Sequence, residues 1–245
     1  MEQKYYQLPY YEEEGKTHFG VGTAQIFYSQ CGEDLEVYVC LIHPFLEFYR
    51  QNKGVFVEVG AGDGVRYSNT KFLEDELGFG GILIEPSPYA HKWLKKTRPK
   101  NRLYDCAVLN RHDSVEFMIQ NETEGWAVSG VADLMRDSIR ENHHNNSRKI
   151  TVSSRPLREI TTENSLARID FLSIDVEGAE LEVLKSMDWS IPTYVAAVEL
   201  GDSDPNDLEA HKMLIDHGFV FLKKMGLSKI YFDPHYFKKI NAGIK

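Results

Sequence analysis

The chain has 245 residues, of which 42% are hydrophobic, 27% charged and 12% aromatic. This composition is that of an ordinary globular protein and excludes a disordered, collagenous or disulfide-stapled chain. Its 37 acidic and 28 basic residues give a net charge of −9. This is the wrong sign for a protein that wraps the phosphate backbone of a nucleic acid, so we expect no nucleic-acid partner.

Targeting and redox signals are weak. The longest apolar stretch, residues 37–48, includes a proline, a histidine and a glutamate, so it is too short and too interrupted to span a bilayer. The first residues lack the basic and then apolar segments of a secretory signal. Three cysteines, none in a C-x-x-C pair, fit buried thiols in a reducing compartment: Cys31, Cys40 and Cys106. We therefore expect a cytoplasmic chain with no membrane span.

Strands and helices alternate along the chain. The predicted elements are a strand at 55–59, a helix at 68–77, a strand at 82–84, a helix at 88–97 and a strand at 102–108, then a strand at 169–174, a helix at 178–187 and a strand at 194–200. Leu208, His211 and Ile215 mark the buried face of a further helix that Gly218 ends. Strands at 219–222 and 229–232 are expected to pair as an antiparallel hairpin. The alternation predicts an α/β fold with a mostly parallel, doubly wound sheet.

Residues 121–149 interrupt the alternation. The segment is polar and rich in Asn, His, Glu and Arg. Long loops in compact domains are usually either functional or disordered, so a solvated surface excursion and a substrate-facing lid both remain open. The adjacent His143 and His144 are either acid-base groups of this insert or simply exposed.

A glycine-rich turn, Glu58-Val59-Gly60-Ala61-Gly62-Asp63-Gly64, follows the first strand. Glycines let a backbone turn sharply and approach a ligand closely. Val65 stands where a dinucleotide fingerprint needs its third glycine, which counts against a nicotinamide or flavin cofactor. An acid followed by G-x-G-x-G suits a nucleoside cofactor with a cationic amino acid moiety, such as S-adenosylmethionine (SAM). A glycine turn without any ligand is the alternative.

Two further turns follow the next strands. Glu85-Pro86-Ser87 lies 21 residues beyond Gly64, where a carboxylate can accept hydrogen bonds from both ribose hydroxyls of a nucleoside. An ordinary exposed glutamate in a proline-rich turn is the alternative. Asp105-Cys106-Ala107 closes the third strand, where an adenine ring would lie beside small residues. A core cysteine and alanine would give the same pattern.

Acidic residues end the fourth and fifth strands. Asp175, Glu177 and Glu180 follow the fourth, and Glu199 ends the fifth. Ligands of open α/β sheets bind outside the carboxyl ends of the strands. Converging acids repel one another unless a cation, a metal ion or a shared proton compensates them, so these are candidates for chemistry. For Glu177 and Glu180 the alternative is a favourable interaction with the dipole of the following helix.

In this order, the motifs resemble the FkbM family of SAM-dependent methyltransferases. The resemblance extends over residues 29–232 and rests on Ser29-Gln30-Cys31-Gly32-Glu33-Asp34, on the glycine turn with Ser68-Asn69-Thr70 behind it, on Ile84-Glu85-Pro86, and on Ile174-Asp175-Val176-Glu177-Gly178-Ala179-Glu180. It implies a class I methyltransferase (Rossmann-like) fold, with a seven-stranded sheet whose last strand is antiparallel and helices on both faces. We expect this domain at 29–245 and an N-terminal extension at 1–28.

The resemblance also implies transfer of a methyl group to a hydroxyl oxygen, often of a sugar or a polyketide. By position, it places Glu58, Gly60, Ala61 and Gly62 around the methionine part of SAM, Glu85 with Pro86 and Ser87 at the ribose, Asp175 at the reaction centre, Gln30 over the cofactor and Asn69 beside it.

An alcohol is a weak nucleophile, so it needs a general base or a divalent ion that lowers its pKa. Asp175 is the first candidate for either role, and Glu177 and Glu199 are the next. Asp175 with Glu199 would offer Mg²⁺ hard oxygen ligands, and the sequence leaves base and metal open. No Asn-Pro-Pro-Tyr follows the fourth strand, which favours oxygen over nitrogen as the methyl acceptor.

The expected acceptor is a hydroxyl of a sugar or glycan, and a polyketide-like small molecule or a protein is the runner-up. Two classes compete with a methyltransferase. An NAD(P)-dependent oxidoreductase needs the glycine spacing that Val65 breaks, and a non-catalytic SAM-binding domain would lack the acids at 175 and 177. The sequence does not predict the oligomeric state.

Overall fold

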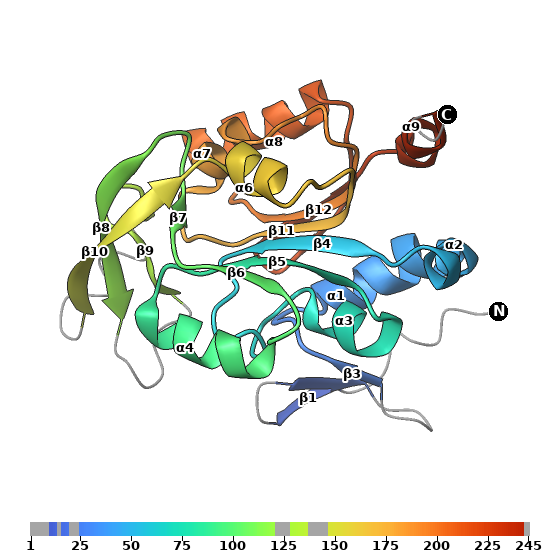
Figure 1. Ribbon diagram of the computed structural model, residues 1–245, viewed down its shortest axis with the longest axis horizontal. Helices are drawn as coiled ribbons and strands as arrows, with labels where there is room; N and C mark the ends of the chain where they lie inside the picture. The colour runs from blue at the N-terminus through green and yellow to red at the C-terminus, as the bar shows by residue number, and fades with distance from the viewer. Residues whose placement is uncertain (1–9, 14–15, 20–24, 121–127, 137–146, 243–245) are drawn as a thin grey trace.

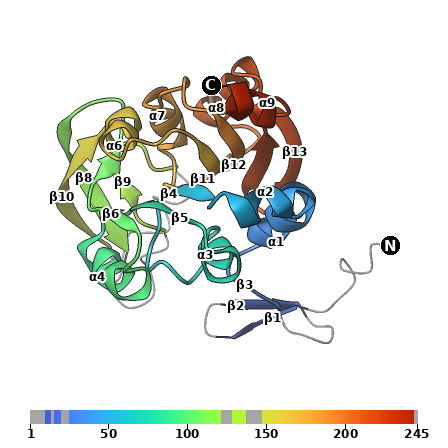
Figure 2. The same ribbon diagram turned by 45° about the vertical axis from the view of Figure 1, so that its right-hand side comes forward.

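Figures 1 and 2 show the computed structural model, which describes residues 10–13, 16–19, 25–120, 128–136 and 147–242. The expected N-terminal extension contains a small antiparallel sheet of β1 (Tyr10–Glu13), β2 (Lys16–Phe19) and β3 (Gln25–Phe27). This sheet lies beside α3 (Lys71–Leu77) in both views. The first 28 residues therefore contribute strands of their own.

The central sheet has seven strands in the order β13-β14-β12-β11-β4-β5-β6. Their bounds are β4 Val55–Val59, β5 Gly80–Ile84, β6 Arg102–Tyr104, β11 Ile169–Ile174, β12 Thr193–Glu199, β13 Val220–Met225 and β14 Ser228–Phe232. Only β14 runs antiparallel to its neighbours within this sheet. This confirms the predicted class I methyltransferase fold and the predicted closing hairpin.

Helices cover both faces of the sheet (Figure 1). α6 (Leu157–Glu163), α7 (Glu180–Lys185) and α8 (Pro205–Asp216) pack on one face, and α3 and α4 (Pro88–Thr97) lie on the other. The second face also receives α1 Glu33–Val37, the π-helical η2 Tyr38–Ile42, the 3-10 turn η3 His43–Phe45, α2 Leu46–Gln51 and α9 Tyr236–Ala242. Every residue of β11 and β12 is buried, because strands covered on both faces need continuous apolar runs.

A second sheet of four strands, β7-β10-β8-β9, stands at one end of the first. It contains β7 Ala107–Val108, β8 Asp113–Gln120, β9 Gly130–Val131 and β10 Ser147–Arg155. The single strand predicted at 102–108 is wrong, because the chain leaves the central sheet after Tyr104 and joins the second sheet at Ala107. Within the 121–149 insert, the described residues form β9, the turn after it and the start of β10; His143 and His144 lie outside the described residues.

Two details of the sequence interpretation need correction. In α8 the buried side chains are Asp207, Ala210 and Leu214, whereas Leu208 and Ile215 of the predicted stripe are exposed. Ala210 and Leu214 pack in the core, and Asp207 accepts from the N–H of Gly201. Among the cysteines only Cys106 is buried, while Cys31 and Cys40 lie exposed on the N-terminal side of the domain.

None of the described helices is long and apolar enough to cross a membrane.

Candidate functional site

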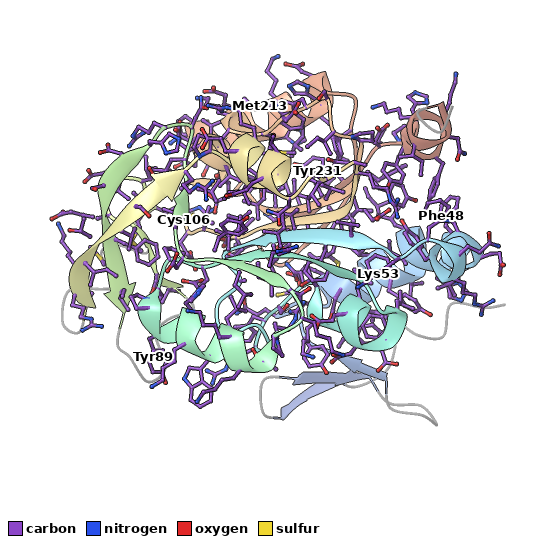
Figure 3. All side chains as sticks on the ribbon, in the orientation of Figure 1. Phe48, Lys53, Tyr89, Cys106, Met213 and Tyr231 are labelled. Carbon is purple, nitrogen blue, oxygen red and sulfur yellow. The ribbon has the colours of Figure 1, made fainter. Side chains whose placement is uncertain are left out.

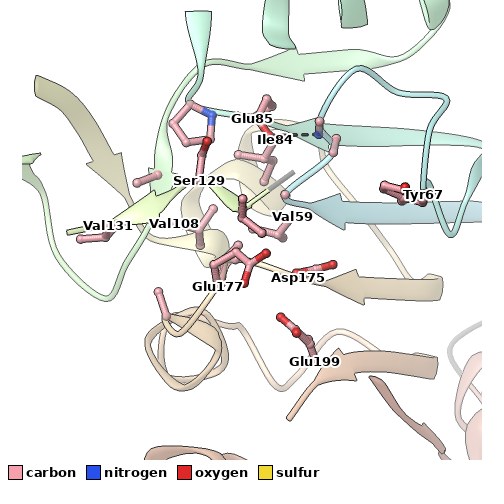
Figure 4. Close-up of a pocket in the computed structure, with 18 of the residues that line it drawn as sticks. Val59, Tyr67, Ile84, Glu85, Val108, Ser129, Val131, Asp175, Glu177 and Glu199 are labelled. Carbon is pink, nitrogen blue, oxygen red and sulfur yellow. Dashed lines mark hydrogen bonds between the residues drawn. The ribbon is translucent and has the colours of Figure 1, made fainter. Parts of the chain in front are cut away.

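A cavity of about 370 Å³ opens at the carboxyl ends of β4, β5, β11 and β12 (Figure 4). The strand order changes direction between β4 and β11, and such switch points leave a crevice in open α/β sheets. One half of the cavity is lined by the glycine turn, Glu85, Cys106 and Ala107, and the other half by acids after β11 and β12. The volume lies within the range of small-molecule sites.

The glycine turn is held close to both neighbouring strands. The backbone N–H groups of Gly60 and Ala61 donate to the carbonyl of Ile84 at 2.9 and 3.1 Å. Gly60 has a φ of 89°, and a Cβ there would lie 1.8 Å from the carbonyl oxygen of Asp175. Only glycine fits this position, so the turn presents backbone rather than side chains to the cavity.

Glu85 lies at the floor of the cavity with 7% of its surface exposed. Its Oε2 accepts from the N–H of Gly62 at 3.0 Å (Figure 4). Its Oε1 accepts from the N–H of Ser87 at 2.7 Å. Burial raises the pKa of this carboxyl group to about 7, although the two N–H donors act in the opposite direction. A carboxylate oxygen can accept more than one hydrogen bond, so both retain capacity for a ligand's hydroxyl groups.

Glu58 does not line the cavity. Its buried carboxylate accepts from Ser68 Oγ at 3.0 Å, from the N–H of Asn69 at 2.9 Å and from Thr70 Oγ1 at 2.7 Å. The fully buried guanidinium of Arg98 lies 3.8 Å away and also donates to the carbonyl of Gly64 at 3.0 Å. The structure thus places Glu58 in the wall that supports the glycine turn.

Some of the expected cofactor residues line the cavity, and others lie behind its wall. Gln30, Gly60, Ala61, Gly62, Glu85, Pro86, Cys106, Ala107 and Asp175 line the cavity. Of the described residues, Asn69, Ser87 and Asp105 stand outside its lining. Asn69 donates to Ser173 Oγ at 3.0 Å beneath the turn, and Ser87 caps α4 by accepting from the N–H of Ala90. These two side chains position cavity walls.

Asp34 shapes the turn that brings Gln30 to the cavity. Its buried carboxylate accepts from the N–H of Tyr28 at 2.7 Å and from Ser29 Oγ at 2.5 Å. Burial raises the pKa of Asp34 to about 6, and the hydrogen bonds to Ser29 and Tyr28 oppose that shift. An ionised Asp34 therefore belongs to the ordered turn at neutral pH.

Asp175, Glu177 and Glu199 meet in the second half of the cavity. Each offers a carboxylate oxygen, and these oxygens lie within 4.8 Å of one another (Figure 4). Asp175 keeps contact with solvent through the cavity, yet the surrounding protein and then the carboxylates of Glu199 and Glu177 raise its pKa well above its usual range. Burial, followed by Glu199, raises the pKa of Glu177 to about 8. The acids predicted from two separate strands are brought together.

Arg136, which the sequence analysis missed, supplies positive charge to this acid cluster. Its Nη1 lies 2.9 Å from Glu199 Oε2 and 3.9 Å from Glu177 Oε2, and its Nη2 lies 3.3 Å from Glu180 Oε2. Nη2 also donates to the carbonyl oxygen of Glu199 at 2.9 Å, and Nε lies 3.5 Å from Asp207. One guanidinium therefore faces several carboxylates at once.

Two glycines allow the Arg136 turn to reach the acids. A Cβ on Gly178 would lie 2.2 Å from the carbonyl oxygen of Leu134, and one on Gly130 would lie 3.2 Å from that of Val176. Residues 130–136 thus pack directly on the turn after β11. Val128, Ser129 and Val131 line the cavity beside Arg136, so the described part of the insert faces the site.

The raised pKa values predict that the protein loses stability as pH rises. A carboxyl group whose pKa is higher in the folded state than in the unfolded state binds extra protons when folded, so the free energy of unfolding falls between the two pKa values. Glu85 and Glu180 at about 7 and Glu177 at about 8 place this window between about pH 4.5 and pH 8. We expect a higher urea midpoint at pH 5.5 than at pH 8; a higher midpoint at pH 8 would contradict the assignment.

The central sheet is parallel except for β14, the second strand from one edge, and the glycine turn lies at the switch point of the strand order. These features define a class I methyltransferase domain. The family model of the methyltransferase FkbM domain matches residues 58–226. Since that range is more than half of the chain, the chain belongs to the FkbM methyltransferase family.

Individual relatives are more distant. Methyltransferase sdnD of Sordaria araneosa is 33% identical over 124 residues, which are 49% of this chain and 41% of that protein. The match thus spans less than half the length of this curated relative. The crystal structure of methyltransferase FkbM from Methylobacillus flagellatus KT aligns with a TM-score of 0.45 and 15% identity over 82% of this chain and 52% of that one. A human methyltransferase 10 domain containing protein aligns with a TM-score of 0.40 and 10% identity, over 77% and 79% of the chains.

Proposed function

We propose that this chain is a SAM-dependent O-methyltransferase that methylates a hydroxyl group, most directly of a sugar or glycan. The observation that carries the proposal is the two-sided cavity, in which a ribose-binding carboxylate and a glycine turn face a cluster of strand-end acids. Family membership supports methyl transfer. The oxygen acceptor is supported by Asp175-Val176-Glu177-Gly178 after β11, where many amino-group methyltransferases carry a different motif.

The residues present fit SAM. Glu85 would accept hydrogen bonds from the ribose hydroxyls, and the backbone of the glycine turn would face the methionine part. Cys106, Ala107 and Val108 form a small apolar surface suited to an adenine ring. When bound, SAM supplies an electrophilic methyl group on a cationic sulfur. Asp175 and Glu177 would favour that positive charge.

Asp175 is the proposed proton acceptor. Methylation of an alcohol forms an O–C bond, breaks the S–C bond and releases the hydroxyl proton, which needs a base within reach. Asp175 lines the cavity, and one of its carboxylate oxygens lies within 4.8 Å of a carboxylate oxygen of Glu199. The negative charge of Glu199 favours a proton on Asp175, which makes Asp175 a better acceptor than an isolated aspartate.

A divalent ion on Asp175 and Glu199 is the alternative to the base. The carboxylate oxygens of Asp175, Glu177 and Glu199 lie within 4.8 Å of one another, which favours a bound ion. Arg136 is evidence against a bound ion, because its guanidinium already pairs with Glu199 and lies near Glu177. Loss of turnover in EDTA with recovery in Mg²⁺ would establish the metal; turnover that ignores EDTA would leave Asp175 as the base.

The acceptor would enter beside the insert. Ser129 is buried next to the cavity, and among the described residues no group forms a hydrogen bond with its Oγ. A buried hydroxyl without a partner is costly, and a polar group of the acceptor would satisfy it. A polyketide-like small molecule or a protein hydroxyl remains the second candidate, and a role of residues 121–149 as a lid is part of this proposal. We also keep a cytoplasmic location as a prediction.

Calorimetric titration tests the cofactor first. We expect micromolar binding of SAM and no binding of NAD⁺ or NADP⁺, followed by methylated products in a screen of sugars and glycans by mass spectrometry. Binding of NAD⁺ in place of SAM would overturn the proposal in favour of an oxidoreductase. Binding of SAM without any transfer, in every acceptor class tried, would favour the non-catalytic SAM-binding alternative.

Glu85→Gln is expected to weaken SAM binding at pH 8 by at least about tenfold, because a neutral amide replaces the charged acceptor of the ribose hydroxyls. The exposed Glu76→Gln on α3 is the matched control and should bind SAM normally. Wild-type affinity should also fall as pH drops below about 7, where Glu85 becomes protonated. An affinity of Glu85→Gln equal to that of the control would remove Glu85 from the site.

A further inference from the structure

α4 and the loop after it form a basic ridge on an acidic protein. Between Pro86 and Tyr104 the chain has six basic residues and no acidic one, although its net charge is −9. Arg98 is turned inward and fully buried. The other five are exposed and, together with Tyr89 and Trp93, define what we call the α4 ridge: Lys92, Lys95, Lys96, Lys100 and Arg102.

The charges of the α4 ridge are not compensated. Within the described part of the chain, none of its five cations forms an ion pair. Glu74, which accepts from Asn101 in the same loop, is paired with the buried Arg98, and Asp63 accepts from backbone N–H groups. Exposed cations elsewhere commonly have carboxylate partners; examples are Lys149 with Glu116, Lys185 with Glu209, Lys212 with Asp216 and Lys224 with Asp202. The ridge therefore differs from the rest of the surface in its charge balance.

Packing fixes which side of α4 faces outward. Ala90, His91 and Leu94 are buried against the sheet, so the helix cannot turn its lysines away from solvent. Lys92 and Lys96 are four residues apart and share the outer face of the helix. Tyr89 lies at the outer end of α4 (Figure 3), and four residues on, Trp93 is 43% exposed. Lys96 Nζ lies 4.8 Å from the Trp93 ring, which joins cations and aromatic rings in one patch.

We propose that the α4 ridge binds the surface of an anionic lipid bilayer. Lysine and arginine side chains close to such a surface are attracted to its charged headgroups. Tyrosine and tryptophan favour the membrane–water interface, where a ring can sit among the headgroups beside flexible ammonium stems. α4 offers both features on its outer face, with exposed lysines beside Trp93, while its apolar face packs on the sheet.

The position of the ridge favours a bilayer over a nucleic acid. α4 is an outer element of the fold in Figures 1 and 2, and none of the five exposed cations lines the cavity of the site. Proteins that bind single-stranded nucleic acid instead use a basic groove with rings that stack on successive bases. Ser87, the N-cap of α4, directly follows Glu85 and Pro86 of the cavity. A bilayer bound at the ridge would thus lie close to the cofactor half of the site.

Vesicle sedimentation tests this surface without relying on the proposed activity. The full chain is mixed with vesicles of phosphatidylcholine alone or with about one third phosphatidylserine, at about 0.1 M salt, near physiological screening. We expect binding only to the phosphatidylserine vesicles, with a blue shift of tryptophan emission that Trp93→Ala abolishes. Each cation near an anionic surface raises affinity about fivefold, so the double variant Lys92→Gln, Lys96→Gln should bind about 25-fold more weakly.

The matched control changes the same charge elsewhere. Lys212→Gln with Lys238→Gln removes two exposed lysines from α8 and α9, outside the ridge, and should bind vesicles like the wild type. Thermal unfolding should be unchanged in all variants, since every substituted side chain is exposed. Equal binding to pure phosphatidylcholine, equal losses in the ridge and control variants, or binding of single-stranded RNA but not of phosphatidylserine vesicles would each overturn the proposal.

Discussion

Asp175→Asn is expected to lower the turnover number by about 10²–10⁴-fold, the usual contribution of a general base. Asparagine keeps the shape of the side chain and a hydrogen-bonding oxygen, but it cannot accept the proton of the acceptor hydroxyl. The same substitution removes one carboxylate from a cluster in which burial, and then the carboxylates of Glu199 and Glu177, raise the pKa of Asp175. The variant should therefore unfold at a higher temperature than the wild type at pH 8, where that repulsion is largest.

This combination of lost turnover and gained stability separates chemistry from misfolding. Glu182→Gln is the matched control, because Glu182 lies in the next helix and does not line the cavity. Single-turnover measurements with SAM and a methylated-product standard would give the rate. Wild-type turnover of Asp175→Asn would reject Asp175 both as base and as metal ligand.

Much of the fold was predictable because its central strands carry an unambiguous pattern. β4 and β11 are short β-branched runs that end at glycine or acidic turns, and the structure confirms both ranges. The closing hairpin followed from two apolar runs around Gly226. The second sheet was missed, because β8 and β10 are half-exposed strands that pair with each other across a polar insert, so neither alternates with a helix. Such pairing depends on contacts between distant segments.

The site was predictable where a residue's position in the sheet determines its place. Glu85 and Asp175 end parallel strands, so both had to face the crevice. Glu58 is the last residue but one of β4, and Ser68, Thr70 and Arg98 surround its carboxylate. No local sequence pattern predicts that the turn after a strand folds back over it. Arg136 was missed in the sequence because it meets the acids only through the packing of a distant turn. Its one signal was indirect, since the predicted cluster of acids required a nearby cation.

Arg136→Met tests that cation and is expected to lower the free energy of unfolding by about 3–5 kcal/mol at pH 8, the usual cost of removing one partner of a buried ion pair. Methionine fills a similar volume, but Glu180 and Glu199 lose their positive neighbour. Their mutual repulsion then acts without compensation, and the turn that carries residue 136 loses its anchor in the site.

The loss should shrink at pH 5, because protonation removes the repulsion that Arg136 normally offsets. In the wild type, burial already raises the pKa of Glu180 to about 7 while Arg136 acts in the opposite direction, so removal of Arg136 raises it further. Arg111→Met is the control: this exposed arginine also faces two acids, at 3.5 and 3.8 Å, and its loss should cost at most about 1 kcal/mol. Urea unfolding at both pH values measures the difference. A loss of unfolding free energy in Arg136→Met as small as that in Arg111→Met, or an equal loss at pH 5 and pH 8, would contradict this role. Either result would mean that another group compensates the negative charge of the acids. Stabilisation of the wild type by added Mg²⁺ would then identify that group as a divalent ion.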